Sequence, residues 1–104
     1  MTKNRLAVSD AAATDIVEQA NWYSTQSGKA LAERWERSVT SAMMRVLNRP
    51  DAGTPCEFKS SELRSLRRTA VPGFPKHLLF YRFVSGEVLV LRVVHGARDL
   101  EHLF

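Results

Sequence analysis

The sequence predicts an α+β fold in which a helical hairpin packs on a mostly antiparallel four-stranded sheet. In the first half of the 104-residue chain, apolar residues recur at helical spacing. The second half instead carries short runs rich in β-branched and aromatic residues. A short polar break at residues 24–28 separates the two helical patterns, so the helices should pack as antiparallel neighbours. We expect one domain over residues 1–104, because this length is typical of a single hydrophobic core.

The first half predicts a strand, two helices and a loop. A short strand, Arg5–Val8, precedes Ser9 and Asp10, whose side-chain oxygens can cap a helix. The first helix is predicted over residues 10–23 and the second over residues 29–47. Residues 48–55 contain two prolines and a glycine, which predict a loop. The second helix repeats apolar residues on one face, namely Leu31, Trp35, Val39, Ala42, Met43 and Val46.

The second half predicts three strands. Leu66–Val71 alternates in polarity, and the Pro-Gly-Phe-Pro run at residues 72–75 should end that strand in a loop. Residues 77–84 and 87–94 are predicted strands joined by a Ser85-Gly86 turn. If those two residues form the turn, one face carries Leu78, Phe80, Arg82, Leu89, Leu91 and Val93, and the other carries His77, Leu79, Tyr81, Phe83, Val88, Val90 and Arg92. A different loop length would regroup these two sets.

Both faces of this predicted hairpin are apolar, but two helices cover only one of them. A second cover is therefore expected. One interpretation is a groove for a partner chain, of the kind that an amphipathic helix fills. The other is that the tail and loops of the chain fold over this face. We favour the partner interpretation.

The charge balance indicates an anionic partner. The chain has 15 Lys and Arg against 11 Asp and Glu, which gives a net charge of +4. Most of these cations are arginines, whose planar guanidinium binds phosphate or carboxylate in a bidentate manner. An acidic protein or a nucleic acid would fit. Arg64, Arg67 and Arg68, with Lys59 nearby, form the densest basic patch along the sequence.

The sequence lacks the usual patterns of several kinds of functional site. A single cysteine, Cys56, can form neither an internal disulfide nor a multi-thiolate zinc site. Phosphate-binding, dinucleotide-binding and HExxH patterns are missing, so we expect no metal and no small-molecule cofactor. No apolar run approaches the roughly 18 residues of a membrane span, and no leader with a cleavage site is visible. We therefore expect a cytoplasmic protein with no membrane partner.

The carboxy-terminal part of the sequence contains an aromatic-Arg strand end, a short turn, an apolar strand and a His-Gly-x-Arg-Asp segment, here His95, Gly96, Arg98 and Asp99. This pattern resembles that of the RelE/ParE superfamily of bacterial toxins. Upstream, the Ser9-Asp10 entry, the Asp15-Ile16 pair and the Pro50-x-x-Gly53 ending of the second helix also fit. The resemblance covers nearly the whole chain in order and spacing.

The resemblance implies the toxin of a type II toxin-antitoxin system, of the plasmid stabilisation type. Such a toxin is neutralised by a small cognate antitoxin, whose wrapping segment is commonly acidic and apolar. The ParE-like branch poisons DNA gyrase and is not known for nuclease activity, so the leading hypothesis assigns no catalytic residue. For this hypothesis the residues expected to contact a partner are Arg64, Arg67, Arg68, Tyr81, Arg92 and Arg98.

The RelE-like branch implies a different activity, ribosome-dependent cleavage of mRNA. Metal-free RNA cleavage needs a base, an acid and cations on the scissile phosphate. Phe104 stands where such enzymes often place tyrosine and cannot carry a proton, although His102 lies nearby. A third hypothesis is a degenerate, non-toxic member that only binds its antitoxin. The alternative catalytic set for the nuclease consists of Arg68, Arg82, His95 and Arg98.

For several of these residues a purely structural role is the alternative to a functional one. His95 at a strand end can hydrogen-bond to neighbouring backbone, and Arg98 can pair with Asp99. Arg82, inside an apolar strand, is expected to pair with a carboxylate or with carbonyl groups, because an unpaired buried charge is costly. Trp22 and Trp35 are expected in the core or in a helix groove. Cys56 has no evident base partner and is not expected to act as a nucleophile.

Overall fold

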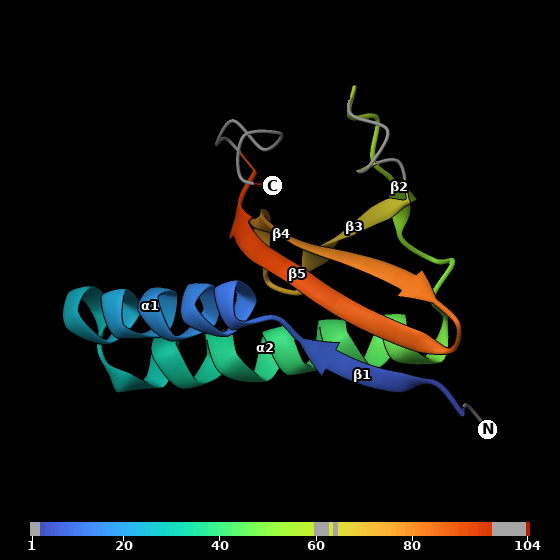
Figure 1. The fold of residues 1–104 in the computed structure, drawn as a ribbon. Coiled ribbons are helices and arrows are strands. Elements are labelled where there is room, and N and C mark those ends of the chain that lie inside the picture. The colour runs from blue at the N-terminus through green and yellow to red at the C-terminus, as the bar shows by residue number, and fades with distance from the viewer. Residues whose placement is uncertain (1–2, 60–62, 64, 97–103) are drawn as a thin grey trace.

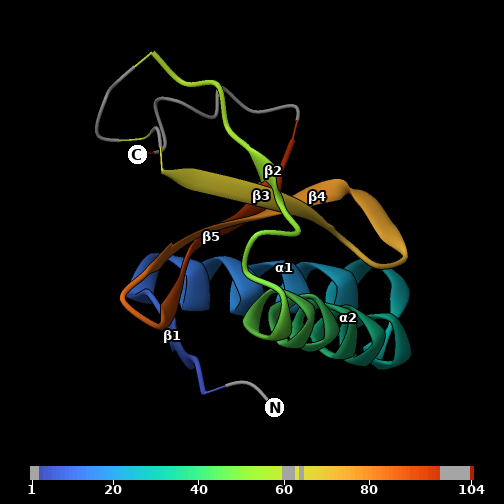
Figure 2. The same ribbon diagram turned by 90° about the vertical axis from the view of Figure 1, so that its right-hand side faces the viewer.

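The computed structural model describes residues 3–59, 63, 65–96 and 104. Two helices pack on one face of a five-stranded mixed sheet (Figures 1 and 2), so the predicted α+β class is confirmed. The strand order is β1-β5-β4-β3-β2, and only β1 and β5 run parallel. The elements are β1 (Arg5–Val8), α1 (Asp10–Ser27), α2 (Lys29–Asn48), β2 (Thr54–Pro55), β3 (Leu66–Val71), β4 (Phe74–Val84) and β5 (Glu87–His95).

The helical hairpin is tighter than the sequence predicts. Ser9 caps α1, since its Oγ accepts a hydrogen bond from the Ala12 N–H at 3.0 Å. The predicted polar break is wrong because α1 continues through it to Ser27. Gly28 alone separates the helices, and its φ of 96° reverses the chain in a conformation that a residue with Cβ rarely adopts. Within the described residues, neither helix is apolar enough to cross a membrane.

The main core lies between the helices and the sheet. Trp35 is fully buried there, and its Nε1–H donates a hydrogen bond to the Ile16 carbonyl at 3.1 Å. Its ring meets Phe74 edge to face at 5.2 Å between centroids. The other fully or nearly fully buried residues of this core include Ala12, Val39, Ala42, Val46, Val71, Leu79, Tyr81, Val88, Val90 and Val93.

The sheet has one strand more than predicted, because Thr54–Pro55 pairs with β3 inside the predicted loop. The loop expected at residues 72–75 is also wrong, since it shortens to a two-residue turn and β4 begins at Phe74. Pro72 and Gly73 suit that turn, because Gly73 has a φ of 79° at the position where positive φ is required. Phe74 is buried against Trp35, which favours pairing over a longer loop.

The predicted Ser85-Gly86 hairpin turn is confirmed. Both residues have positive φ, 52° and 78°, as a tight turn between twisted strands requires. Further along, Tyr81 pairs with Val90 but Phe80 pairs with Arg92, so β5 contains one extra residue at this point. Beyond this bulge the faces exchange. Val93 therefore packs on the helix side, not beside Phe80 as simple alternation predicts.

A second, smaller cluster covers the face of the sheet opposite the helices, called here the outer face. It consists of Cys56, Leu66, Phe80 and Val94, with Phe58, Leu63, Leu78 and Leu91 partly buried around them. Phe58 and Phe104 lie on the Phe80 ring, at 6.3 and 5.4 Å between centroids. Phe80 is thereby fully buried. The chain itself thus covers this part of the outer face, as the second of the two interpretations predicts.

Candidate functional site

Arg68 and Arg82 lie on the outer face, at the edge of the aromatic cluster. Arg68 pairs with Phe80 across β3 and β4, and Leu66 pairs with Arg82, so the two arginines are diagonal neighbours. The Arg82 Nε donates a hydrogen bond to the Ser65 Oγ at 2.9 Å. The two cationic side chains thus lie at the edge of an apolar cluster whose centre the chain itself covers. Their positive charge suits an acidic ligand.

Cys56 lies in this cluster beside Arg68. Burial raises the pKa of the Cys56 thiol, and a hydrogen bond and the charge of Arg68 only partly oppose this rise. The thiol is therefore protonated at neutral pH. This agrees with the expectation that Cys56 is not a nucleophile.

His95 lies on the other side of the sheet from the two arginines. It pairs with His77, whose ring packs against Trp35 on the helix side at 4.8 Å between centroids. The rings of His77 and His95 are 5.4 Å apart. Three residues of the alternative catalytic set are thus divided between two faces. The fourth, Arg98, lies outside the described residues, as do Arg64 and His102.

Arg67 and Tyr81, both expected to contact a partner, hold the loop between α2 and β2. The Tyr81 hydroxyl donates to the Pro50 carbonyl at 2.7 Å and accepts from the Gly53 N–H at 2.9 Å. Arg67 donates to the Gly53 carbonyl at 2.7 Å. Burial raises the pKa of Tyr81. Since Tyr81 is fully buried, its side chain presents no surface to a partner in this structure.

Arg92 is held by an ion pair with α1. Its Nε and Nη2 donate to the two carboxylate oxygens of Asp15 at 2.8 and 2.9 Å, and these hydrogen bonds raise the pKa of Arg92. The same carboxylate accepts from the Val93 N–H at 3.0 Å. Strand β1 pairs with β5 only as far as Val90. Asp15 therefore accepts a hydrogen bond from an N–H group at the edge of β5 that is not paired with another strand. Both expected partner contacts on β4 and β5, Tyr81 and Arg92, thus serve the fold.

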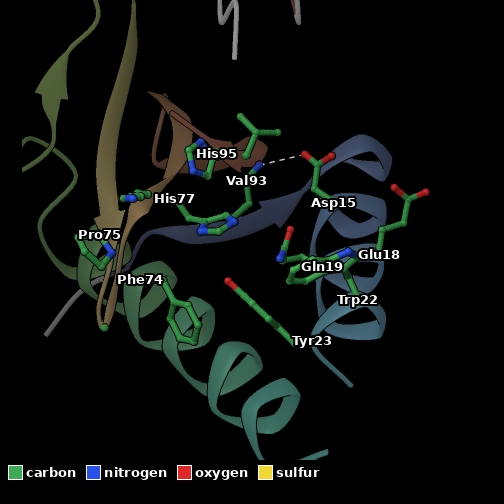
Figure 3. Close-up of a pocket in the computed structure, with 13 residues that line it drawn as sticks. Asp15, Glu18, Gln19, Trp22, Tyr23, Phe74, Pro75, His77, Val93 and His95 are labelled. Carbon is green, nitrogen blue, oxygen red and sulfur yellow. Dashed lines mark hydrogen bonds between the residues drawn. The ribbon is translucent and has the colours of Figure 1, made fainter. Parts of the chain in front are cut away.

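A cleft of about 790 Å³, missed by the sequence reasoning, lies between α1 and the adjoining parts of β4 and β5 (Figure 3). Trp22 lines it and is 57% exposed, so of the two positions expected for Trp22, the core or a helix groove, the core is excluded. The signal was present: Trp22 falls beside Tyr23, and a single apolar stripe cannot bury both. The lining of the cleft also includes Glu18, Gln19, Tyr23, Phe74, His77 and His95.

His77 forms the inner wall of this cleft. It is only 8% exposed, and within the described part of the chain no hydrogen bond to its ring is found. Burial lowers its pKa, and the neighbouring His95 lowers it further. A neutral imidazole carries one donor and one acceptor nitrogen. No fully buried side-chain nitrogen or oxygen of the described residues lacks a hydrogen-bond partner, so the polar edge of the uncharged His77 ring is open to the solvent in the cleft.

The stability of the protein is expected to fall below pH 6.5. The folded state binds a proton at His77 less readily than the unfolded state, in which the pKa of this side chain is 6.5. Neutral His77 therefore contributes fully to the free energy of unfolding above that pH, and this contribution is lost as the pH falls below it. His95 faces the same ring, and Glu18 and Lys76 line the cleft. Urea unfolding at about pH 7.5 and about pH 5.5 measures the change. A His77→Phe variant should show a smaller change; an equal one would assign the effect elsewhere.

Bacterial toxins are among the solved structures that are similar to this one. The chain is similar to a structure of the chromosomal ParDE toxin-antitoxin system from P. aeruginosa, with a TM-score of 0.73, 17% identity, and coverage of 88% of this chain and 95% of that one. A YoeB/ParE toxin from Agrobacterium tumefaciens gives a TM-score of 0.55 at 11% identity, covering 88% and 96%. The isolated E. coli RelE toxin gives 0.53 at 13%, covering 96% and 92%. The fold is that of the RelE/ParE superfamily.

Within that superfamily the sequence itself identifies the branch. Residues 6–100 match the family described as ParE toxin of type II toxin-antitoxin system, parDE. The chain belongs to the ParE toxin family. No curated protein sequence matches it significantly.

Proposed function

We propose that this protein is a toxin that acts by binding, with DNA gyrase as its target and a cognate antitoxin as its neutralising partner. The main support is the position of His95. It lies on the opposite face of the sheet from Arg68 and Arg82. A proton carrier and phosphate-binding cations that must act on one scissile bond are thus kept apart.

Distance along the strands adds to this separation. His95 pairs with His77 and Arg68 pairs with Phe80, which are three residues apart on β4, or roughly 10 Å. General acid-base catalysis needs the groups within hydrogen-bond reach of the reacting atoms. On the outer face, the described neighbours of these arginines include Ser65, the protonated Cys56 and the aromatic ring of Phe104, which carries no proton. This arrangement supports binding rather than RNA cleavage.

The decisive experiment compares the two targets. Purified toxin added to gyrase and supercoiled plasmid is expected to raise the fraction of cleaved complex. In parallel, toeprinting of a translated message is expected to show no toxin-dependent cuts in the ribosomal A site. Unchanged gyrase activity together with A-site cuts would replace this proposal by the RelE-type activity. Normal growth on induction without the antitoxin gene would favour a non-toxic, antitoxin-binding protein.

Antitoxin binding is expected to depend on the outer-face arginines. Arg68→Glu should weaken affinity for the antitoxin encoded beside the toxin gene by roughly tenfold, because it turns an attraction to an acidic segment into a repulsion. Arg37→Glu, which makes the same charge change at an exposed position on α2, is the matched control. Calorimetric titration measures both. Equal losses would indicate a general effect of net charge and not a contact at Arg68.

A further inference from the structure

The charged residues of α2 are divided between the two flanks of the helix. At 3.6 residues per turn, positions i, i+4, i+7 and i+11 form one row along a helix, and here they are Arg34, Ser38, Ser41 and Arg45. The acidic residues of α2, Glu33 and Glu36, lie on the other flank, across the buried face of the helix. The first row is therefore cationic and contains no acidic residue.

The two arginines of this row are held toward the sheet by neutral groups. The Arg34 guanidinium lies over the Phe74 ring, 5.4 Å from its centroid. The Arg45 Nη2 donates hydrogen bonds to the Thr69 Oγ1 at 2.7 Å and to the Ala70 carbonyl at 3.1 Å. Both arginines remain exposed, and within the described part of the chain neither forms an ion pair with a carboxylate. Their positive charges are thus oriented but not neutralised.

A third arginine continues the row beyond the end of α2. Arg67 is two residues from Thr69 on β3, roughly 7 Å along the strand, so both side chains lie on the helix side of the sheet. Burial raises the pKa of Tyr81, and the charges of Arg67 and Arg45 oppose this rise, so both act on the same hydroxyl. Asp51 is the one acid that acts on it. Cations therefore outnumber acids at this end of the row.

The spacing of this row suits a rigid polyanion. Arg34 and Arg45 are eleven residues apart on one helix, or roughly 16 Å, a distance over which one strand of a DNA duplex presents about five phosphates. Between the two arginines lie serine hydroxyls, which can donate to phosphate oxygens. Protein partners and membranes instead favour aromatic or aliphatic anchors, and single-stranded nucleic acid favours aromatic stacking platforms. The row contains none of these.

We propose that the row formed by Arg34, Ser41, Arg45 and Arg67 binds the phosphate backbone of duplex DNA. It lies on the helix side of the sheet (Figures 1 and 2), so it is separate from the outer-face arginines. The choice of DNA over duplex RNA rests on the proposed function, because gyrase acts on DNA. Backbone contacts of this kind are independent of base sequence and add to the affinity for a target that already holds DNA.

The first test measures DNA binding directly, without gyrase. A short fluorescein-labelled DNA duplex is titrated with the full-length toxin, and binding is followed by fluorescence anisotropy. With three phosphate contacts, the logarithm of the binding constant is expected to fall with the logarithm of the salt concentration at a slope of about −3. Lack of binding at low salt would overturn this proposal. It would leave the proposed target unaffected, because gyrase is not in the assay.

Matched variants decide whether the row is the site. Ser41→Glu and Thr40→Glu add the same charge at adjacent exposed positions, the first in the row and the second on the acidic flank. Ser41→Glu should weaken DNA binding at least about threefold more than Thr40→Glu and should reduce the salt slope by about one. Arg34→Gln and Lys29→Gln give the same comparison by removing a cation, since Lys29 lies beside Glu33 on the acidic flank.

Equal losses of affinity within both pairs of variants would overturn the proposal, because they would indicate an effect of net charge alone. Far-UV circular dichroism checks that each variant is folded. Tighter binding of an RNA duplex of the same sequence would also overturn it, since the site would then be one for RNA. Competition by a poly-glutamate peptide as effective as that by unlabelled DNA would do the same, since it would identify a site for acidic protein.

Discussion

Replacement of Trp35 by alanine is expected to lower the free energy of unfolding by about 3–5 kcal/mol. Trp35 is fully buried, and it lies among Tyr23, Phe74 and His77 at the centre of the main core. The substitution removes these contacts, leaves a cavity and leaves the Ile16 carbonyl without its indole donor. An effect of this size is a large fraction of the stability of a small domain. Urea unfolding followed by far-UV circular dichroism measures it.

Trp22→Ala is the control for this measurement. It deletes the same side chain from the same helical hairpin, but at a position that is 57% exposed. We expect a loss of less than about 1 kcal/mol, as at most surface sites. If the two variants lost similar stability, the assignment of Trp35 to the core and Trp22 to the cleft would be contradicted.

Replacement of Asp15 by alanine is expected to cost about 2–3 kcal/mol. The change leaves the Arg92 guanidinium without its carboxylate and the Val93 N–H without its acceptor. The side chains of Arg92 and Asp15 are 19% and 12% exposed, so solvent compensates only part of the loss. Amide hydrogen exchange at Val93 should also become faster, because the edge N–H then opens to water.

The exposed pair of Lys29 and Glu33 provides the comparison. Its atoms are 3.8 Å apart, with side chains 86% and 50% exposed. Glu33→Ala is therefore expected to change the free energy of unfolding by less than about 0.5 kcal/mol. A similarly small effect of Asp15→Ala would mean that the Arg92 ion pair does not hold α1 against β5.

Local sequence signals predicted most of the fold. Strand β3 has the predicted bounds, and the Ser85-Gly86 turn sets the expected register of β4 and β5 as far as the bulge beside Phe80. The bulge opposite Phe80 could not be predicted, since the alternation of residues along β5 gives no sign of an extra residue. The two-residue strand β2 was missed for a related reason: its pairing comes from β3 and not from its own sequence.

The roles of individual side chains were harder to predict than the elements. Arg67, Tyr81 and Arg92 were expected at an interface, but their partners are loop carbonyls and a carboxylate that lie distant in the sequence. A sequence shows that an arginine is present and not which acceptor the fold brings to it. The cleft was missed because its walls come from separate elements, with Trp22 and Glu18 on α1 and His77 on β4.

The parallel pairing of β1 with β5 has a consequence for synthesis on the ribosome. Ser9 and Leu91, which are joined by a hydrogen bond at the end of this pairing, are 82 residues apart. The two helices form from local contacts and can assemble early, whereas β1 must wait until β5 has left the exit tunnel. The sheet therefore closes late. Until then, the nascent chain exposes the apolar face of α2 and the free edge of β1, where premature association with other chains is most easily initiated.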